Sequence, residues 1–291
     1  MRADLFLVEH GFATTRSQAQ RLIASGVQWR VQVETDVEVT WKRVAKNGDE
    51  IPETAELEVL DNTEAKYISR GGIKLEGALK RTGLDVAGLR CLDIGQSTGG
   101  FTDCLLQHGA AQVVGVDVGH GQLHATMRDD PRVVCIEGVN ARSLTADDLA
   151  EHYRRALHLK NGGEDNDEDL YADASDDEDG EGFDPLFDFL TGDLSFISLT
   201  LVLPAVVRLL KADGHLLMLV KPQFELQPGQ IGKGGIVRDP VHFEFVEKRL
   251  RDTCGGLGVD VLGWMESPIA GGDGNREFFI CARNNAPASN L

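Results

Sequence analysis

Short apolar runs alternate with amphipathic stretches over most of the 291 residues. The runs that read as buried strands lie near 90–94, 112–117, 133–136, 187–191 and 215–220. The stretches with apolar residues at helical spacing lie near 101–108, 146–158, 198–210 and 241–254. This alternation predicts an α/β domain with a parallel sheet covered by helices on both faces. Because no helical pattern separates residues 258–266 from 276–283, we expect an antiparallel hairpin at the end of the sheet.

The first 60 residues follow a different pattern. An apolar stretch at the N-terminus predicts one short helix, and Thr15 followed by Gln18 is a capping-box pattern that opens a second, closed by Gly26. Two segments with alternating apolar residues, VQWRVQVE and AELEVLD, read as strands. The predicted organisation is an α+β domain over 1–60, a linker over 61–66, an α/β domain over 67–285 and a tail over 286–291.

The stretch CLDIGQSTGGF, residues 91–101, joins a strand to a helix through a glycine-rich turn. Backbone N–H groups in such a turn can approach a ligand closely at the carboxyl end of a strand. The next strand ends in Asp117, a carboxylate placed to accept hydrogen bonds from two ribose hydroxyls. A dinucleotide fingerprint would need glycine where Ser97 stands, and a P-loop would need Lys after the glycines. The pattern resembles the S-adenosylmethionine site of class I (Rossmann-like) methyltransferases; the alternative is a glycine turn that binds no ligand.

Four charged residues fall at predicted strand ends or beside this turn: Lys74, Asp193, Lys221 and Glu277. The carboxyl ends of parallel strands converge on one crevice, where the cofactor also binds, so these four should meet there. A set of two lysines and two carboxylates suits removal of the proton from a ribose 2′-OH. Lys221 would be the base, and the other three would orient Lys221 and the hydroxyl. For each residue taken singly, a solvated charge at a strand end is the alternative.

The net charge of −18 has a local origin. Residues 161–184 hold twelve Asp and Glu and no Lys or Arg, which leaves −6 for the rest of the chain. With few apolar residues and dense like charge, this segment is predicted to be a disordered insert. The acidic balance is mildly unfavourable to nucleic-acid binding, so any RNA contact has to come from local basic patches.

Other features of the sequence narrow the class of protein. No apolar run reaches the roughly 20 residues needed to span a bilayer, and Asp4, Glu9 and His10 interrupt the N-terminal apolar stretch, which argues against a signal peptide. Five cysteines without metal-ligand spacing favour reduced thiols in a cytoplasmic protein and predict no metal site. Base N-methylation usually needs a Pro-Pro motif after the strand predicted over 187–191, and the segment GDLSF at this point has none. Methylation at C5 of a base needs a cysteine nucleophile beside the same strand, and the sequence has none there.

Five motifs occur in order along the chain: SRGGIKL, DIGQSTGGFTD, GDLSFISL, LVKPQFE and SPIAGGDGNREFF. Ahead of them, R-x-D-x-x-L and T-R-S-x-A-x-x-L-I-x-x-G-V at the N-terminus are similar to the S4 RNA-binding fold. Together they closely resemble the hemolysin A (TlyA) family, ribosomal RNA 2′-O-methyltransferases related to the FtsJ group. The resemblance implies that the substrate is ribosomal RNA, free or in a ribosomal subunit. The family's hemolysin label leaves one alternative, a membrane-active or RNA-binding protein that retains the methyltransferase fold.

The resemblance also implies roles for individual residues. In the glycine turn, Gly95, Ser97, Gly99 and Phe101 would surround the methionine portion of S-adenosylmethionine, and Thr98 and Gly100 would also bind the cofactor. Asp117 would contact the ribose of the cofactor, and Asn140 would lie near its adenine. In the S4-like domain Arg16 and Arg21 would face RNA phosphates, and Arg70, at the start of the helix that carries Lys74, would join this RNA-binding set.

Overall fold

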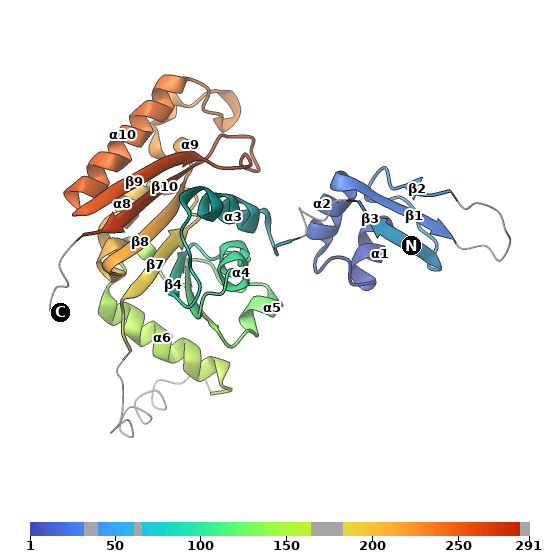
Figure 1. Cartoon of the computed structure of the whole chain (residues 1–291), viewed down its shortest axis with the longest axis horizontal. Helices are drawn as coiled ribbons and strands as arrows, with labels where there is room; N and C mark the ends of the chain where they lie inside the picture. Colours follow the sequence, from blue (N-terminus) through green and yellow to red (C-terminus); the bar gives the residue numbers. More distant parts are fainter. Residues whose placement is uncertain (32–39, 61–65, 164–182, 286–291) are drawn as a thin grey trace. The chain divides into compact units, whose positions relative to one another are not determined.

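The structure is a computed structural model that describes residues 1–31, 40–60, 66–163 and 183–285 (Figure 1). The predicted tail, residues 61–65 of the predicted linker and residues 164–182 of the predicted acidic insert lie outside the described residues. The chain divides into two units, Met1–Ile73 and Lys74–Leu291, and the division falls within one helix.

The first unit packs two helices on a small antiparallel sheet. Its elements are α1 (Ala3–Glu9), α2 (Arg16–Gly26), β1 (Val27–Val31), β2 (Lys42–Arg43) and β3 (Ala55–Val59), with β1 in the centre of the sheet. Thr15 caps α2 as predicted, because its hydroxyl accepts from the Gln18 amide at 3.1 Å. The Gln18 side chain bonds to the amide of Thr14 at 2.6 Å, so the predicted capping box is shifted by one residue. Apolar side chains from both helices and from β1, including Phe6, Leu22 and Val27, form the core.

The second unit is built on a sheet that has seven strands among the described residues, in the order β6-β5-β4-β7-β8-β10-β9. The strands are β4 (Arg90–Ile94), β5 (Gln112–Asp117), β6 (Val133–Glu137), β7 (Phe187–Gly192), β8 (Leu210–Val220), β9 (Val259–Glu266) and β10 (Phe278–Asn284). The first five in the sheet order are parallel, and β10 pairs antiparallel with both β8 and β9. The predicted parallel sheet and its closing hairpin are therefore confirmed.

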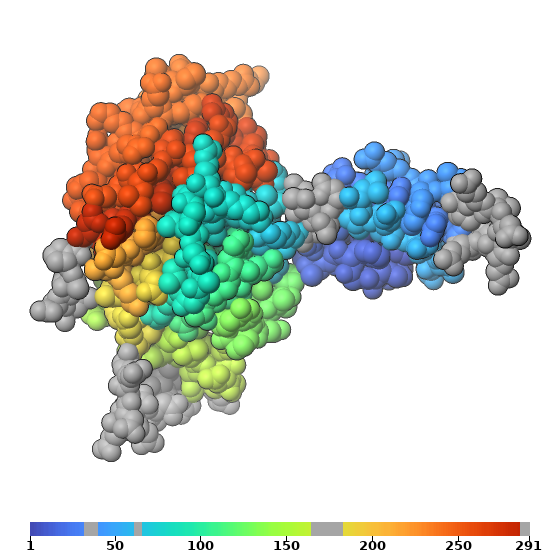
Figure 2. All heavy atoms as spheres, viewed as in Figure 1, coloured from blue at the N-terminus to red at the C-terminus, as the bar shows by residue number. Residues whose placement is uncertain are grey.

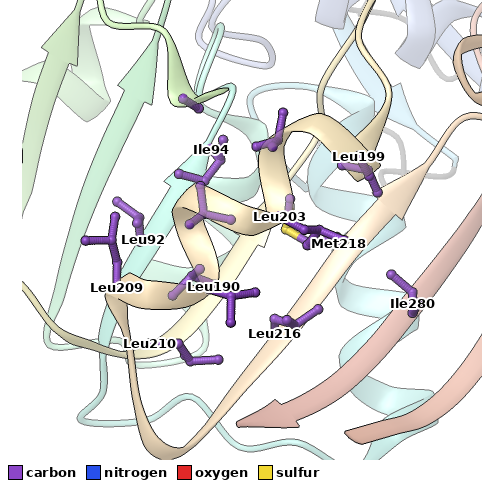
Figure 3. Packing of buried hydrophobic residues seen from close by; sticks show 14 of the residues in the cluster. Leu92, Ile94, Leu190, Leu199, Leu203, Leu209, Leu210, Leu216, Met218 and Ile280 are labelled. Atoms are coloured by element: carbon purple, nitrogen blue, oxygen red, sulfur yellow. The ribbon is translucent and has the colours of Figure 1, made fainter. Parts of the chain in front are cut away.

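Helices cover both faces of this sheet. They are α3 (Arg70–Thr82), α4 (Gly100–Gln107), α5 (Ala125–Arg128), α6 (Ala146–Lys160), α8 (Leu199–Val206), α9 (Pro222–Glu225) and α10 (Pro240–Gly256). Side chains of α6, α8 and α10 share one large core with Leu92 and Ile94 of β4 and with alternate residues of the neighbouring strands. Figure 3 shows α8 lying over this part of the sheet, with Leu199 and Leu203 above Met218 and Leu190.

Two boundaries differ from the sequence prediction. The predicted helix over 198–210 ends at Val206 and continues as a 3₁₀ turn over Val207–Leu209, after which β8 begins at Leu210. The insert predicted over 161–184 extends too far at its end, because Phe183 and Asp184 are held by the second unit. The ring of Phe183 lies 4.3 Å from that of Tyr153, and Arg90 Nη1 donates to the carbonyl of Asp184.

Candidate active site

The glycine loop, residues 95–99, leads from the end of β4 into α4. The amide of Gly95 donates to the carbonyl of Val116 at 2.8 Å, which ties the loop to the end of β5. Gly95 and Gly99 have φ values of +81° and +94°, a region that favours glycine. A Cβ atom on Gly95 would lie 2.9 Å from the carbonyl oxygen of Asp193, so the loop approaches the end of β7 too closely for a side chain.

Asp117 lies directly beside this loop at the end of β5. Its Oδ2 accepts from the amide of Ser97 at 2.7 Å, and its Oδ1 accepts from the amide of Gly119 at 2.7 Å. An ionised carboxylate offers about four acceptor positions, so capacity remains for hydroxyl donors from a ligand. The amide of Val139 donates to the Asp117 carbonyl at 3.0 Å, which brings exposed Asn140 to the same edge of the sheet. This arrangement fits the ribose and base of a nucleoside cofactor.

The remaining residues predicted around the cofactor divide by exposure. Ser97 and Thr98 are exposed on the loop, whereas Gly100 and Phe101 are buried in the first turn of α4. The ring of Phe101 packs 6.2 Å from that of Phe279 on β10. Phe101 could therefore contribute to cofactor binding through its backbone, while its ring belongs to the core.

We expect Gly95→Val to weaken S-adenosylmethionine binding at least tenfold. The valine side chain would meet the Asp193 carbonyl, and the left-handed backbone would cost about 1–3 kcal/mol in strain. Gly88→Val is the matched control, because Gly88 has a φ of +73° but no heavy atom within 4 Å of an added Cβ. Calorimetric titration of both variants checks the prediction, which equal affinities would contradict.

Asp93, the first residue of the motif DIGQSTGGF, is fully buried on β4 and was missed as a site candidate. Its Oδ2 accepts from the hydroxyl of Thr102 at 2.7 Å, and that hydroxyl accepts from the Gln96 side-chain amide at 2.9 Å. Burial raises the pKa of Asp93 to about 7, and the charges of Asp193 and Asp117 add to the effect while the Thr102 hydrogen bond opposes it. A charged residue in a buried strand was the signal that could have singled it out.

The raised pKa of Asp93 predicts a pH-dependent stability. Protonation of the folded protein favours folding, so this contribution is fully present below about pH 4 and is lost as pH rises through about 7. Asp93→Asn removes the titration but keeps a neutral acceptor for Thr102. Between about pH 5 and pH 8 the free energy of unfolding of the natural chain should fall by roughly 2–4 kcal/mol relative to that of the variant. Urea unfolding across this range tests it, and parallel pH profiles would show that Asp93 does not titrate there.

Lys74 and Glu277 form a buried ion pair. Lys74 lies on α3, Glu277 comes just before β10, and Lys74 Nζ is 2.6 Å from Glu277 Oε2. The two side chains are 9% and 3% exposed, so both charges are removed from water. Figure 2 shows α3 and the C-terminal hairpin as neighbours on one face of the second unit, as this pair requires.

Lys221 and Asp193 form a second pair at the ends of β8 and β7. Lys221 Nζ lies 2.5 Å from Asp193 Oδ1 and donates to the Ser195 hydroxyl at 2.9 Å. Burial raises the pKa of Glu277, and Lys74 opposes this; the charge of Asp193 raises the same pKa and that of Lys221 lowers it. All four predicted residues therefore meet at the carboxyl edge of the sheet. The sequence did not single out Ser195 as a partner of Lys221.

An exposed aromatic residue lies beside the Lys221 pair. Phe196 is 90% exposed, although it follows Ser195 directly. Its φ of +63° is uncommon for a residue with a side chain, and its ring lies 5.0 Å from that of Phe224 on α9. A non-glycine residue with a backbone in the left-handed region costs energy, and such residues cluster at binding sites.

The arginines predicted to bind RNA are placed differently from one another. Arg16, at the start of α2, is exposed and its Nη2 lies 2.9 Å from Oδ2 of the buried Asp4. Arg2 binds the same carboxylate at 3.0 Å, and these hydrogen bonds hold the pKa of Asp4 well below its usual range. Arg21 is half-buried and donates to the Ile68 carbonyl at 3.5 Å, and Arg70 opens α3.

The glycine loop, the carboxylate at the end of β5 and the two lysine–carboxylate pairs occupy a single edge of one sheet. Residues 67–284 match the model of the FtsJ-like methyltransferase family. The chain belongs to the FtsJ-like methyltransferases. The class I methyltransferase fold and the resemblance read from the motifs are confirmed, and S-adenosylmethionine is the cofactor of this class.

Relatives of this FtsJ-like methyltransferase include proteins with two kinds of name. The 16S/23S rRNA (cytidine-2′-O)-methyltransferase TlyA of Mycobacterium tuberculosis is 38% identical over 97% of this chain and 89% of its own length. Hemolysin A of Brachyspira hyodysenteriae is 34% identical over 96% of this chain and 98% of its own length. A solved structure from Streptococcus thermophilus with hemolysin in its name is 35% identical, with a TM-score of 0.64, over 100% of this chain and 91% of that one.

Proposed function

We propose that this FtsJ-like methyltransferase methylates the 2′-hydroxyl of a ribose in ribosomal RNA. The observation that carries the proposal is the meeting of the Lys221–Asp193 and Lys74–Glu277 pairs beside the glycine loop. A ribose hydroxyl holds its proton tightly at neutral pH, so its methylation needs a base and groups that orient the oxygen. The relative named a cytidine-2′-O-methyltransferase supports this choice of substrate.

S-adenosylmethionine, when bound, supplies an electrophilic methyl group. The glycine loop would lie against its methionine portion, Asp117 would accept from its ribose hydroxyls, and the segment of Asn140 would lie at its adenine side. The close approach of Gly95 to the Asp193 carbonyl supports this fit, because it places the loop next to the Lys221 pair.

The protein's own residues would carry out the proton transfer. Lys221 Nζ, in its neutral form, would accept the proton of the ribose 2′-OH and so make the oxygen nucleophilic toward the methyl group that the cofactor would supply. Asp193 and Ser195 orient the amine, and Asp193 stabilises the ammonium that forms. Lys74, held by Glu277, would donate a hydrogen bond to the hydroxyl oxygen and stabilise its developing negative charge.

Phe196 supports RNA rather than a small molecule as the substrate. Sequence-specific RNA binding commonly stacks unpaired bases on exposed aromatic side chains. The Phe196 ring is 90% exposed and directly follows Ser195, a contact of Lys221. A base stacked there would bring its ribose to the reacting groups.

The S4-like domain, residues 1–60, would supply affinity. We expect Arg16→Ala with Arg21→Ala to weaken RNA binding and to lower the salt slope by about one for each phosphate that the protein no longer binds. Arg30→Ala is the control, because Arg30 lies on the sheet and pairs with Glu56 at 2.7 Å. Filter binding at several salt concentrations measures both effects. Equal slopes for the three proteins would mean that the face of α2 does not contact phosphate.

Mapping of 2′-O-methyl marks on ribosomal RNA, from cells with and without the gene, tests the proposed function. We expect one or more ribose marks to disappear when the gene is deleted. A liposome-leakage assay addresses the alternative, a membrane-active protein. Within residues 1–31, 40–60, 66–163 and 183–285, every helix falls short of the length and apolar character that crossing a bilayer requires. Leakage without loss of any ribose mark would overturn the proposal.

We further propose the cytoplasm, where ribosomal RNA is found, as the place of action.

A further inference from the structure

A buried carboxylate lies close to Lys221 in the chain but has no part in the proton transfer. Glu225 ends α9, four residues after Lys221, and is 3% exposed. Burial raises the pKa of Glu225, while hydrogen bonds from Ser198 and Leu199 oppose the shift. The carboxylate accepts from the Ser198 hydroxyl at 2.5 Å and from the Leu199 amide at 2.7 Å. A buried carboxylate bound in this way has a specific structural task.

The donors to Glu225 lie where the β7–α8 loop, residues 193–198, meets α8: Ser198 is the last residue of the loop and Leu199 is the first of α8. Ser198 caps α8, and its hydroxyl accepts from the Thr200 amide at 3.2 Å while donating to Glu225. The beginning of the same loop carries Asp193 and Ser195, which both contact Lys221 Nζ. Contacts therefore join the β7–α8 loop to the segment 221–225 at both ends, through Lys221 at one end and through Glu225 at the other.

A third element holds this junction in place. Arg249 of α10 donates through Nη1 to the Glu225 carbonyl at 2.8 Å and through Nη2 to the Thr200 hydroxyl at 3.3 Å. The flanking residues Val246 and Leu250 are fully buried, so α10 is anchored in the core of the second unit. The position of Glu225 relative to α8 is thus fixed by packed helices.

We infer that Glu225 is a positioning residue for methyl transfer. Its carboxylate holds the β7–α8 loop against the segment of Lys221, so that Asp193 and Ser195 stay within hydrogen-bond distance of the amine. This inference rests on the proposed function and deepens it. Without the carboxylate, the Leu199 amide and the Ser198 hydroxyl lose their acceptor, and the loop can shift. A displacement of about 1 Å at a reacting group can cost roughly 10²-fold in rate.

Glu225→Ala tests the inference through the single-turnover rate at saturating RNA and cofactor. We expect the rate to fall about 10–100-fold. The affinity for S-adenosylmethionine should change less than about threefold, because the glycine loop and Asp117 belong to other strands. Glu225→Gln keeps an oxygen that can accept from the Leu199 amide, and it should recover most of the rate. A fall in cofactor affinity with an unchanged transfer rate would overturn the inference.

Asn284→Ala is the matched control for a merely structural role. Asn284 is 6% exposed and donates to the carbonyls of Leu210 and Lys211 at 2.8 and 3.2 Å, at the opposite edge of the sheet. Asn284→Ala should lower the melting temperature about as much as Glu225→Ala does, but it should leave the single-turnover rate near normal. All proteins are assayed well below their melting temperatures. Equal rate losses in Asn284→Ala and Glu225→Ala would overturn the inference.

Amide hydrogen exchange gives a readout that does not depend on methylation. Exchange over residues 193–199 should be faster in Glu225→Ala than in the natural chain, while β6 is unchanged. Exchange that is equal in both proteins would overturn the inference. Faster loop exchange, combined with a natural enzyme that methylates no ribose, would overturn the proposed function and leave the role of Glu225 in holding the loop intact.

Discussion

Replacing Lys221 by alanine should lower the single-turnover rate of methyl transfer by roughly 10²–10⁴, the usual range for a positioned acid–base group. Lys221 Nζ lies between Asp193 Oδ1 and the Ser195 hydroxyl, so its amine is oriented by two contacts. Cofactor binding should survive, because the glycine loop and Asp117 do not depend on this side chain. Rapid-quench measurements with saturating RNA give the rate, and calorimetry gives the cofactor affinity.

Lys221→Arg separates a base from a residue that only orients the ribose. A guanidinium keeps the positive charge and the hydrogen bonds but does not release its proton in a protein, so this variant should be as slow as Lys221→Ala. Lys211→Ala is the matched control, because Lys211 lies in the same strand and pairs with Asp188 at 3.1 Å, far from the site along β8. Near-normal turnover by Lys221→Arg would rule out the base role.

Replacing Lys74 by methionine should lower the free energy of unfolding by about 3–5 kcal/mol, the cost of leaving one member of a buried pair without its partner. The variant would keep Glu277, which is 3% exposed, buried without the lysine that pairs with it. Burial already raises the pKa of Glu277, and Lys74 opposes that shift, so its loss raises the pKa further. The deficit should therefore be smallest in acid, where the carboxyl group is protonated, and should grow as pH rises.

The double variant Lys74→Met with Glu277→Gln distinguishes stability from activity. Removing both charges should restore much of the lost stability, because the desolvation cost disappears with them. Methyl transfer should stay slow, since the variant lacks the Lys74 ammonium that would stabilise the hydroxyl oxygen. Denaturant unfolding at two pH values and single-turnover assays measure the two effects. A single Lys74→Met variant as stable as the natural chain would show that the pair is not stabilising.

Much of the second unit could be predicted because its strands are buried on both faces. Strands β4 and β5 are buried over nearly their whole length, and the chain leaves the first at Gly95 and the second at Asp117. The ends of such runs then located the glycine loop, Asp117, Asp193, Lys221 and Glu277. The two-residue strand β2 carries exposed Lys42 and Arg43 and has no apolar signal to read. Phe183 is an isolated aromatic residue in an acidic stretch, and nothing local shows that it packs on Tyr153.

The sequence could not predict which lysine of the site forms an ion pair with which carboxylate. The carboxyl ends of parallel strands converge, which predicts that Lys74, Asp193, Lys221 and Glu277 lie together. This convergence does not decide which lysine binds which carboxylate. That choice depends on the position of α3 over β10, and the structure gives Lys74 to Glu277. The contact of Glu225 with Leu199 spans 26 residues and joins a backbone amide to a side chain, so no local pattern indicates it.

The position of β10 between β8 and β9 determines the order in which these strands can join the sheet during synthesis. β9 is synthesised before β10, yet among the strands that the structure describes it pairs with β10 alone. Lys74 is synthesised some 200 residues before Glu277, so their ion pair can form only after most of the chain has been made. A nascent chain therefore contains all five parallel strands and the glycine loop before the Lys74–Glu277 pair can form. A chain cut short before residue 277 would contain the glycine loop and Asp117 but would lack Glu277, one of the four residues that we propose for catalysis.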